Sequence, residues 1–335
     1  MPIRIAINGF GRIGRAAFKV ALTKKKYEVV AINDLMESAT LAHLLKYDTI
    51  YGNYGQEVKF DRKHLIVNGK KYLVIAEKEP NKLPWKKLKV DVVLECTGRF
   101  TTQNDAKAHL KAGARKVILS APAKDDITPT YILGVNVQGK IKQDIISNAS
   151  CTTNCIAPVA QIITSAFGVK KAMMTTVHSV TAEQNLVDGP PPGLHKDLRR
   201  ARAASQNIVP TTTGAAKATF KVVPELKGVF DGMAVRVPTI CGSIADFTFV
   251  LKKKTSAQQV NNIFKRAANN PRFKGILQVT TEPLVSSDII GSPYSSIVDL
   301  SLTQVVDGDL VKVVAWYDNE WGYANRLVEM VEKVI

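Results

Sequence analysis

A cysteine and a histidine in the middle of the sequence could form a nucleophile and base pair. Cys151 lies in the stretch SCTTNC (150–155), directly before a helical apolar pattern. Ser, Thr and Asn are preferred at helix N-caps, and the positive end of the helix dipole favours a thiolate there. His178 ends the strand-like run Met173–Val177. If it faces Cys151, the two would form a Cys–His pair, but the sequence does not show that they meet.

A simpler interpretation applies to the other cysteines and histidines. A lone cysteine is most often a small buried side chain, and most lone histidines are structural. Four cysteines without a CxxC pair predict neither a disulfide framework nor a metal site, so we expect free thiols in a reducing compartment. These residues are Cys96, Cys155, Cys241, His43, His64, His109 and His195.

A glycine-rich turn near the N-terminus predicts a dinucleotide site. Gly9, Gly11 and Gly14 form a GxGxxG that follows the apolar run Ile3–Ile7. The first glycine makes a tight turn, the second lets the backbone approach a pyrophosphate, and the third lets helix and strand pack closely. Asp34 comes about twenty residues later, where a carboxylate accepts hydrogen bonds from the ribose of NAD and repels the 2′-phosphate of NADP. The alternative is an ordinary turn at Asp34.

The elements around this turn predict an α/β fold, a Rossmann-type parallel sheet domain. Strands alternate with helices, which implies right-handed crossovers between parallel strands. Asn68-Gly69 is a hairpin turn signal. The expected strands are Ile3–Ile7, Val29–Ile32, Val90–Leu94 and Val117–Leu119, with helices from the glycine turn to Leu22 and over Asn104–Lys111.

The second half predicts an α+β domain with a mostly antiparallel sheet. Its long strand-like runs are followed by a hairpin turn at Asp307-Gly308 and a helical pattern over Asn319–Val334. We place the first domain at residues 1–150, completed by the last helix at about 318–335, and the second domain at 151–317. The expected strands are Lys171–Val177, Gly228–Val237, Ser243–Leu251, Leu302–Val306 and Leu310–Val314.

The chain of 335 residues carries a net charge of +17, which favours anionic partners. Lysine runs at 24–26, 86–87 and 252–254 are explained most simply as solvated faces, and the alternative is weak, salt-dependent polyanion binding. No apolar run approaches the roughly 20 residues of a membrane helix, and the first residues do not resemble a signal peptide. We therefore expect a cytoplasmic protein.

Several stretches together resemble the phosphorylating glyceraldehyde-3-phosphate dehydrogenases, nearly from end to end. The cysteine motif, within SNASCTTNC, is the most specific of them. The others are INGFGRIGR, LAHLLKYD, SAPAKDD, TTTGAAKA, GMAVRVPT and WYDNEWGY.

The resemblance implies a glycolytic, NAD-dependent oxidoreductase that assembles as a homotetramer. It would convert glyceraldehyde 3-phosphate and inorganic phosphate to 1,3-bisphosphoglycerate through a Cys151 thioester, with His178 as base. By family likeness, NAD is bound by Gly9, Gly11, Arg12, Ile13, Gly14, Asp34, Lys78, Ser120 and Asn319. The substrate and phosphate residues would be Ser150, Thr152, Thr181, Arg200, Thr213, Gly214 and Arg236, with Arg200 favoured over Arg199.

Two segments depart from the family pattern. The stretch 190–194 is longer and richer in proline, which leaves the choice between Arg199 and Arg200 open. Ile240-Cys241-Gly242 replaces an expected Asn-Val step, and we place it in the sheet at a subunit interface. Two other functions stay open: an erythrose-4-phosphate dehydrogenase, and an anion-binding protein that has kept the fold.

Overall fold

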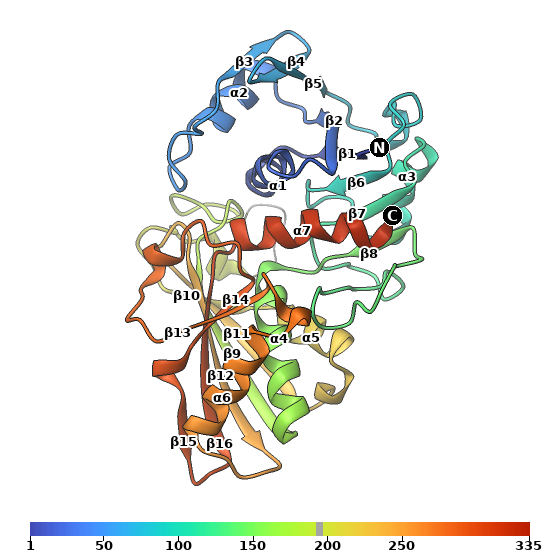
Figure 1. Cartoon of the computed structure of the whole chain (residues 1–335). Helices are drawn as coiled ribbons and strands as arrows, with labels where there is room; N and C mark the ends of the chain where they lie inside the picture. The colour runs from blue at the N-terminus through green and yellow to red at the C-terminus, as the bar shows by residue number, and fades with distance from the viewer. Residues whose placement is uncertain (192–196) are drawn as a thin grey trace. The chain divides into compact units, whose positions relative to one another are not determined.

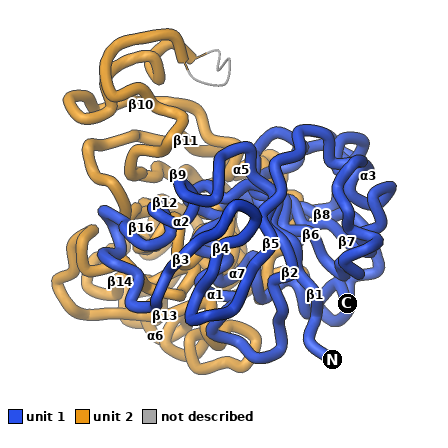
Figure 2. The backbone as a smooth tube through the Cα atoms, turned by 90° about the horizontal axis from the view of Figure 1, so that it is seen from above, with its two compact units in different colours: residues 1–131, 137–150, 323–335 blue, residues 132–136, 151–322 orange. Residues whose placement is uncertain are grey.

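The computed structural model describes residues 1–191 and 197–335. The chain forms two compact units, which Figures 1 and 2 show. Unit one contains residues 1–131, 137–150 and 323–335, and unit two contains residues 132–136 and 151–322. The chain passes from one unit to the other after Ser150, and the short segment 132–136 belongs to unit two although the sequence-based limits placed it in the first domain.

Unit one is built on an eight-stranded sheet in the order β3-β4-β5-β2-β1-β6-β7-β8. The strands β5, β2, β1, β6, β7 and β8 are parallel to their neighbours, while β3 and β4 add antiparallel pairs at one edge. This confirms the predicted Rossmann-type sheet. The elements are β1 (Ile3–Asn8), α1 (Arg12–Leu22), β2 (Tyr27–Asn33), α2 (Ser38–Lys46), β3 (Val58–Asp61), β4 (His64–Val67), β5 (Lys70–Ile75), β6 (Val92–Glu95), α3 (Gln103–Lys111), β7 (Lys116–Leu119) and β8 (Ile145–Ser147).

Both predicted hairpin turns are present. Asn68 and Gly69 join β4 to β5 with φ values of 48° and 76°, and Asp307 and Gly308 join β15 to β16 with φ values of 46° and 74°. Two successive residues with positive φ match the twist of the flanking strands, and Asn, Asp and Gly tolerate this conformation best. Local residue chemistry was therefore enough to find these turns.

The C-terminal helix α7 (Trp321–Val334) starts two residues later than the sequence predicts. The carboxylate of Asp318 accepts hydrogen bonds from the backbone N–H groups of Glu320 and Trp321, so it caps the helix. From Tyr323 onward the helix belongs to unit one, where Leu327 is fully buried and Glu332 accepts a 2.6 Å hydrogen bond from the Tyr27 hydroxyl.

The described part of unit two contains a second sheet, in the order β10-β11-β9-β12-β16-β14-β13, with β15 paired to β16. Most neighbouring strands are antiparallel, as predicted, and β11–β9 and β13–β14 are parallel. Helices α4, α5 and α6 cover one face of this sheet (Figure 1). The elements are α4 (Cys151–Phe167), β9 (Val169–Ser179), β10 (Val209–Thr212), α5 (Ala215–Val222), β11 (Phe230–Val237), β12 (Ser243–Leu251), α6 (Ala257–Ala268), β13 (Leu277–Thr280), β14 (Ser296–Asp299), β15 (Gln304–Val306) and β16 (Leu310–Tyr317).

No helix among the described residues is both long enough and apolar enough to cross a membrane. Helix α4 continues through Pro158, which the sequence left either tolerated or kinking. Proline there removes one intrahelical hydrogen bond, and the helix is buried along most of its length, so packing compensates for that loss.

A buried polar cluster ties the parallel strands of unit one together. The Glu95 carboxylate, at the end of β6, accepts hydrogen bonds from Asn8 Nδ2 at 2.5 Å and from His109 Nε2 at 2.9 Å. The Trp85 indole donates to His109 Nδ1 at 3.0 Å, which places the imidazole proton on Nε2. All four residues are at most 2% exposed, so each member depends on the others for its hydrogen bonds.

We predict that His109→Phe lowers the free energy of unfolding by about 2–4 kcal/mol, because it leaves the buried Trp85 N–H without a partner and removes one of the two hydrogen bonds to Glu95 Oε2. His43→Phe is the matched control, since His43 is exposed on α2 and its replacement should change stability by less than about 0.5 kcal/mol. Urea unfolding of both variants measures the difference. Equal midpoints would show that the cluster does not stabilise unit one.

Candidate functional site

The glycine turn between β1 and α1 has the shape of a phosphate cradle. Gly9 has a φ of 91°, and a Cβ on Gly14 would lie 2.0 Å from the Gly9 carbonyl oxygen, so neither position accepts a side chain. Around Gly11, by contrast, nothing lies within 4 Å of the place of a Cβ. The turn is therefore closed on the protein side and open at Gly11, as backbone approach to a pyrophosphate requires.

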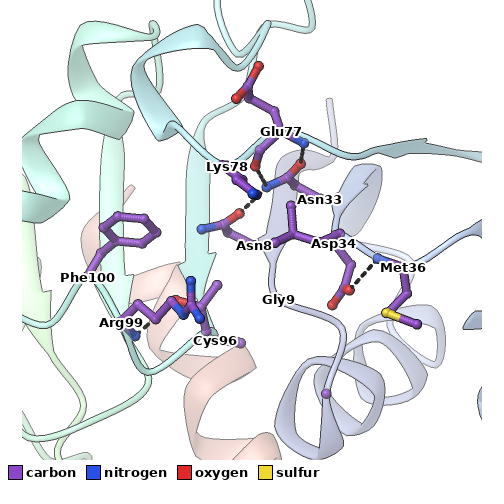
Figure 3. A pocket seen from close by; sticks show the side chains of 13 residues that line it. Asn8, Gly9, Asn33, Asp34, Met36, Glu77, Lys78, Cys96, Arg99 and Phe100 are labelled. Carbon is purple, nitrogen blue, oxygen red and sulfur yellow. Dashed lines mark hydrogen bonds between the residues drawn. The ribbon is translucent and has the colours of Figure 1, made fainter. Parts of the chain in front are cut away.

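A cavity of about 380 Å³ opens beside this turn (Figure 3). Asp34 lies in its wall, directly after β2, and its carboxylate accepts hydrogen bonds from the N–H groups of Phe10 at 2.7 Å and Met36 at 3.1 Å. Asn33 Nδ2 donates to Asn8 Oδ1 at 2.6 Å and to the Glu77 carbonyl at 2.9 Å. These bonds hold the ends of three neighbouring strands in one arrangement around the cavity.

The cavity brings together some of the predicted cofactor residues and not others. Gly9, Gly11, Asp34 and Lys78 line it, whereas Gly14 packs against the turn from behind. Arg12 forms a 2.8 Å ion pair with Asp48 and lies over the Tyr51 ring, and Arg12, Ile13 and Ser120 are not among the lining residues.

Cys96 differs from its expected role as a buried apolar side chain. It is partly exposed and lines the cavity beside Gly9. The parallel sheet explains this position, because residues directly after a strand meet at the carboxyl edge, where such ligand sites form. The sequence signal for this was the position of Cys96 two residues after the predicted strand Val90–Leu94.

The residues of this site fit a dinucleotide. The open backbone at Gly11, the N-terminus of α1 and the Asp34 carboxylate supply the features that a pyrophosphate and an adenosine ribose need. The cavity volume lies within the range of small-molecule sites.

In unit two, the predicted nucleophile and base do meet. Cys151 is the first residue of α4, and its Sγ lies 3.5 Å from Nε2 of His178, near the end of β9. His178 Nδ1 lies 2.7 Å from the Ser179 carbonyl oxygen, which can only accept, and 3.1 Å from Arg236 Nη1, which can only donate, and the shorter contact favours the proton on Nδ1. Nε2 is therefore the free base that faces the thiol.

Burial and the Arg236 guanidinium lower the pKa of His178 to about 3. The imidazole is therefore neutral at physiological pH and able to accept a proton. Arg236 pairs with His178 in the register of β11 and β9, and its Nη1 donates to the Ser179 carbonyl at 3.1 Å. The short bonds to this one carbonyl hold both side chains in place.

Burial raises the pKa of the Cys151 thiol, while the charge of Arg236 and hydrogen bonds from Thr152 lower it. The backbone N–H groups of Cys151 and Thr152 at the start of the helix lower this pKa, as expected, but desolvation outweighs them and the pKa is raised overall. Thr152 Oγ1 lies 2.9 Å from the Tyr317 hydroxyl, and that hydroxyl lies 2.8 Å from Thr176 Oγ1. This buried chain of hydroxyls anchors the first turn of α4 to β9 and β16.

Two arginines converge on one carboxylate near the end of β9. Arg200 Nη1 lies 2.6 Å and Arg236 Nη2 lies 3.5 Å from Glu183 Oε1, and Arg236 Nη1 donates to Thr181 Oγ1 at 3.3 Å. Arg199, in contrast, is exposed and bidentate to Asp197. Geometry thus groups Arg200, not Arg199, with Arg236 and Thr181. Part of the stretch 190–194 lies outside the described residues, as does His195.

Two other predicted phosphate residues precede a helix. Thr213 and Gly214 stand directly before α5, where the Thr213 hydroxyl accepts a hydrogen bond from the Ala215 N–H at 3.2 Å and the place of a Cβ on Gly214 is open.

In unit one, Ser150 follows Ala149, which has a φ of 53° and whose carbonyl accepts a hydrogen bond from the Tyr323 hydroxyl. Positive φ at a non-glycine residue is strained and is common next to functional sites.

Asn319 is buried in unit two, and its Oδ1 accepts hydrogen bonds from the Gly242 N–H at 3.2 Å and the Ser243 hydroxyl at 2.9 Å. The stretch 240–242 is a connection between β11 and β12 and packs beside Asn319, so its placement in the sheet was wrong. Gly242 explains the difference, because its φ of 87° does not fit a strand.

The sequence interpretation missed Glu183, Tyr317 and Ser243. Glu183 follows Thr181 by two residues, which was a usable signal once Thr181 was singled out. Tyr317 lies in the stretch WYDNEWGY, two residues before Asn319, so that motif was a usable signal. Ser243 reaches the site only through strand pairing, so no local pattern marks it.

A strand–glycine turn–helix with an acidic residue after the second strand, joined to a domain in which a cysteine contacts a histidine, is typical of an NAD-dependent oxidoreductase. The family model for the NAD-binding domain of glyceraldehyde 3-phosphate dehydrogenase matches residues 3–103, and the model for its C-terminal domain matches residues 150–319. The chain belongs to the glyceraldehyde-3-phosphate dehydrogenase family.

Curated relatives cover almost the whole chain. The glyceraldehyde-3-phosphate dehydrogenase of Geobacillus stearothermophilus is 52% identical over 334 residues, 98% of this chain and 97% of the relative. That of Mycolicibacterium smegmatis is 52% identical over 345 residues, 100% of this chain and 99% of the relative. That of Streptomyces coelicolor is 51% identical over 334 residues, 98% of each chain.

We predict that iodoacetamide labels Cys151 before the other three cysteines. Burial raises the pKa of Cys96 to about 12 and that of Cys155 further, and Cys241 is buried, whereas Cys151 is partly exposed beside a neutral base. Arg236→Leu should slow labelling of Cys151 severalfold at fixed pH, because the charge that lowers its pKa is removed. Peptide mass spectrometry measures both.

Arg199→Leu is the matched control for this charge, since Arg199 is exposed and paired with Asp197. It should leave the labelling rate unchanged. Faster labelling of Cys96 or Cys155 than of Cys151 would contradict the assignment of the nucleophile.

Proposed function

We propose that this chain catalyses the NAD-dependent oxidative phosphorylation of glyceraldehyde 3-phosphate to 1,3-bisphosphoglycerate, through a thioester on Cys151. The observation that carries the proposal is the 3.5 Å contact between Cys151 Sγ and the deprotonated Nε2 of His178, in a site with two arginines. Unit one would serve as the NAD-binding domain and unit two as the catalytic domain.

Cys151 attacks the aldehyde carbon while its thiol proton passes to Nε2 of His178, and His178 returns this proton to the carbonyl oxygen, which gives the hemithioacetal. For the oxidation, the same Nε2, free again, takes the proton of the hemithioacetal hydroxyl, because the Nδ1–H of His178 is already bonded to the Ser179 carbonyl. NAD, when bound, accepts a hydride. Inorganic phosphate then cleaves the thioester and restores the thiol of Cys151. Backbone N–H groups at Ser150–Thr152 would stabilise the oxyanion.

Substrate phosphate and attacking phosphate require cationic pockets. Arg236 and Arg200 are mostly buried, and both contact Glu183, whose carboxylate occupies an anion position between them. We assign these two arginines, with Thr181, Thr213 and Gly214, to phosphate binding, since a guanidinium bonds phosphate bidentately. When the two phosphates bind, each arginine would have to exchange its contact with Glu183 for a contact with one phosphate.

For the other cofactor contacts, Gly9, Gly11 and Gly14 would hold the pyrophosphate turn, and Asp34 the adenosine ribose. Asn319 would contact the nicotinamide amide. The same proposal assigns supporting positions around NAD to Arg12, Ile13, Lys78 and Ser120.

The catalytic proposal is tested by NADH formation from glyceraldehyde 3-phosphate, NAD and phosphate. Cys151→Ser should abolish the reaction while NAD binding is retained, because a serine hydroxyl does not supply the anion that a thiol does. Cys155→Ser, which changes a buried thiol four residues further on, should keep most of the activity. NADH formation by Cys151→Ser at the parent rate would overturn the mechanism.

Two other functions are distinguished in the same assay. A higher kcat/KM with erythrose 4-phosphate than with glyceraldehyde 3-phosphate would identify the alternative substrate. Binding of NAD and phosphate with no turnover of either aldehyde would identify an anion-binding protein.

Cofactor choice is expected to depend on Asp34. Asp34→Ala should weaken NAD binding about ten- to a hundredfold, the effect of losing a charge-assisted hydrogen bond, and should narrow the preference over NADP because a like charge is removed. Asp61→Ala changes a partly exposed carboxylate on β3 outside the cavity and should alter the binding of neither cofactor. Equal efficiency of the parent protein with NAD and NADP would refute this role.

We also propose a homotetramer in the cytoplasm. Burial alternates along β12, and the same sheet exposes Met173 on β9 and Met233 on β11. Such apolar side chains on a sheet surface suit contact with a second copy. Light scattering should give four times the chain mass of 36.6 kDa.

The net charge of +17 favours weak polyanion binding, and the affinity should fall steeply between low and physiological salt.

A further inference from the structure

The connection between β11 and β12 is held in one conformation by a glycine that accepts no replacement. Gly242 has a φ of 87°, and a Cβ there would lie 2.1 Å from the Ser286 carbonyl oxygen. The connection is also bonded to the end of β9, since the Val180 N–H donates to the Thr239 carbonyl at 2.9 Å and the Ser179 hydroxyl donates to the Gly242 carbonyl at 3.1 Å. Its N–H groups are therefore donors with a fixed direction.

One of these donors, the Gly242 N–H, identifies the orientation of the Asn319 amide. The Gly242 N–H lies 3.2 Å from Asn319 Oδ1 and, as a backbone N–H, can only donate. The atom that faces it must be the oxygen, because the amide nitrogen has no acceptor to offer. Asn319 Nδ2 therefore points the other way, and none of the hydrogen bonds among the described residues involves it.

The direction of the Ser243 hydroxyl is also determined. The Ser179 N–H donates to Ser243 Oγ at 3.1 Å, so the hydroxyl proton is free for Asn319 Oδ1, 2.9 Å away. Ser179 directly follows His178 and accepts the Nδ1–H of that imidazole on its carbonyl. The three residues Ser179, Ser243 and Asn319 are at most 5% exposed, where water does not compete for these bonds.

We propose that Ser243, together with the backbone of Gly242, is a positioning residue that holds the Asn319 amide with its N–H₂ group toward the nicotinamide carboxamide. The inference rests on the proposed function. A donor at this position selects the carbonyl oxygen of the carboxamide, whereas the flipped amide would select its NH₂ group. Ser243 thereby joins the group that orients the nicotinamide to the strand end that carries the catalytic base.

The test uses Ser243→Ala in the full-length protein, with NAD and with the NAD analogue in which an acetyl group replaces the carboxamide. That analogue keeps the carbonyl oxygen and lacks the NH₂ group. We expect kcat to fall about three- to tenfold with both cofactors and by the same factor, as expected for one lost hydrogen bond, with a smaller change in KM for the cofactor. Asn319→Asp, which replaces the donor by an acceptor, should cause a larger loss with both.

Ser296→Ala is the matched control, because Ser296 is a fully buried serine on β14 of the same sheet, where its hydroxyl contacts the thiol of Cys155. It should leave the kcat ratio of NAD to the analogue unchanged and kcat near that of the parent. Thermal unfolding identifies any variant that fails to fold, and Ser243→Thr, which retains the hydroxyl, should then recover activity.

A loss with NAD but not with the acetyl analogue would mean that Asn319 contacts the NH₂ group, and would overturn the proposed orientation. A Ser243→Ala variant with parent kinetics would remove Ser243 from any positioning role. An inactive parent protein would instead refute the proposed function itself, so the two failures are distinguishable.

Discussion

The register of β9 within its sheet is the constraint on which the catalytic unit depends. The strand is paired with β11 on one side and β12 on the other, and this register places His178 opposite Arg236. A shift by one residue would turn His178 to the opposite face of the sheet and away from Cys151. The long ladders on both sides, and the buried hydroxyls of Thr176 and Tyr317, make such a shift costly.

The same strand end concentrates charge in a buried place. Burial lowers the pKa of His178 most, and the positive charges of Arg236 and Arg200 lower it further, so the imidazole is neutral. Burial raises the pKa of Cys151 while Arg236 lowers it, so the balance at the thiol depends on a residue whose charge phosphate would partly neutralise. Glu183 compensates the two arginines within the protein itself. One carboxylate thus faces two guanidinium groups, and the remaining positive charge suits the site to anions.

In unit one, side-chain hydrogen bonds fix the carboxyl ends of the parallel strands around a cavity that is accessible to a ligand. Asn8 and Asn33 bond to each other across β1 and β2, and Asn8 is held in turn by Glu95. The side chains that shape the cavity wall are therefore supported by His109 and Trp85, which lie behind it and are fully buried. A histidine that the sequence marked as structural proves to support the cavity through this cluster.

The sequence by itself determined the features that depend on neighbours in the chain. Glycine spacing predicted the turn before α1, and Asn-Gly and Asp-Gly predicted both hairpins. Apolar periodicity placed the elements that it marked to within a few residues, but it did not mark α2, α5, α6, β3, β8, β10, β13 or β14. These succeed because turn conformation, helix capping and burial patterns are set by local sterics and hydrogen bonding. The family motifs added residue roles that local chemistry alone could not supply.

Only the tertiary structure decided which distant residues meet. The contact of Cys151 with His178 joins residues far apart in sequence, and the choice of Arg200 over Arg199 depends on which of the two faces Glu183. The direction of the Cys151 pKa depends on burial, and the orientation of Asn319 depends on a connection between two other strands. Strand pairing and desolvation are properties of the folded chain, because they arise from contacts between segments that no short stretch of sequence contains.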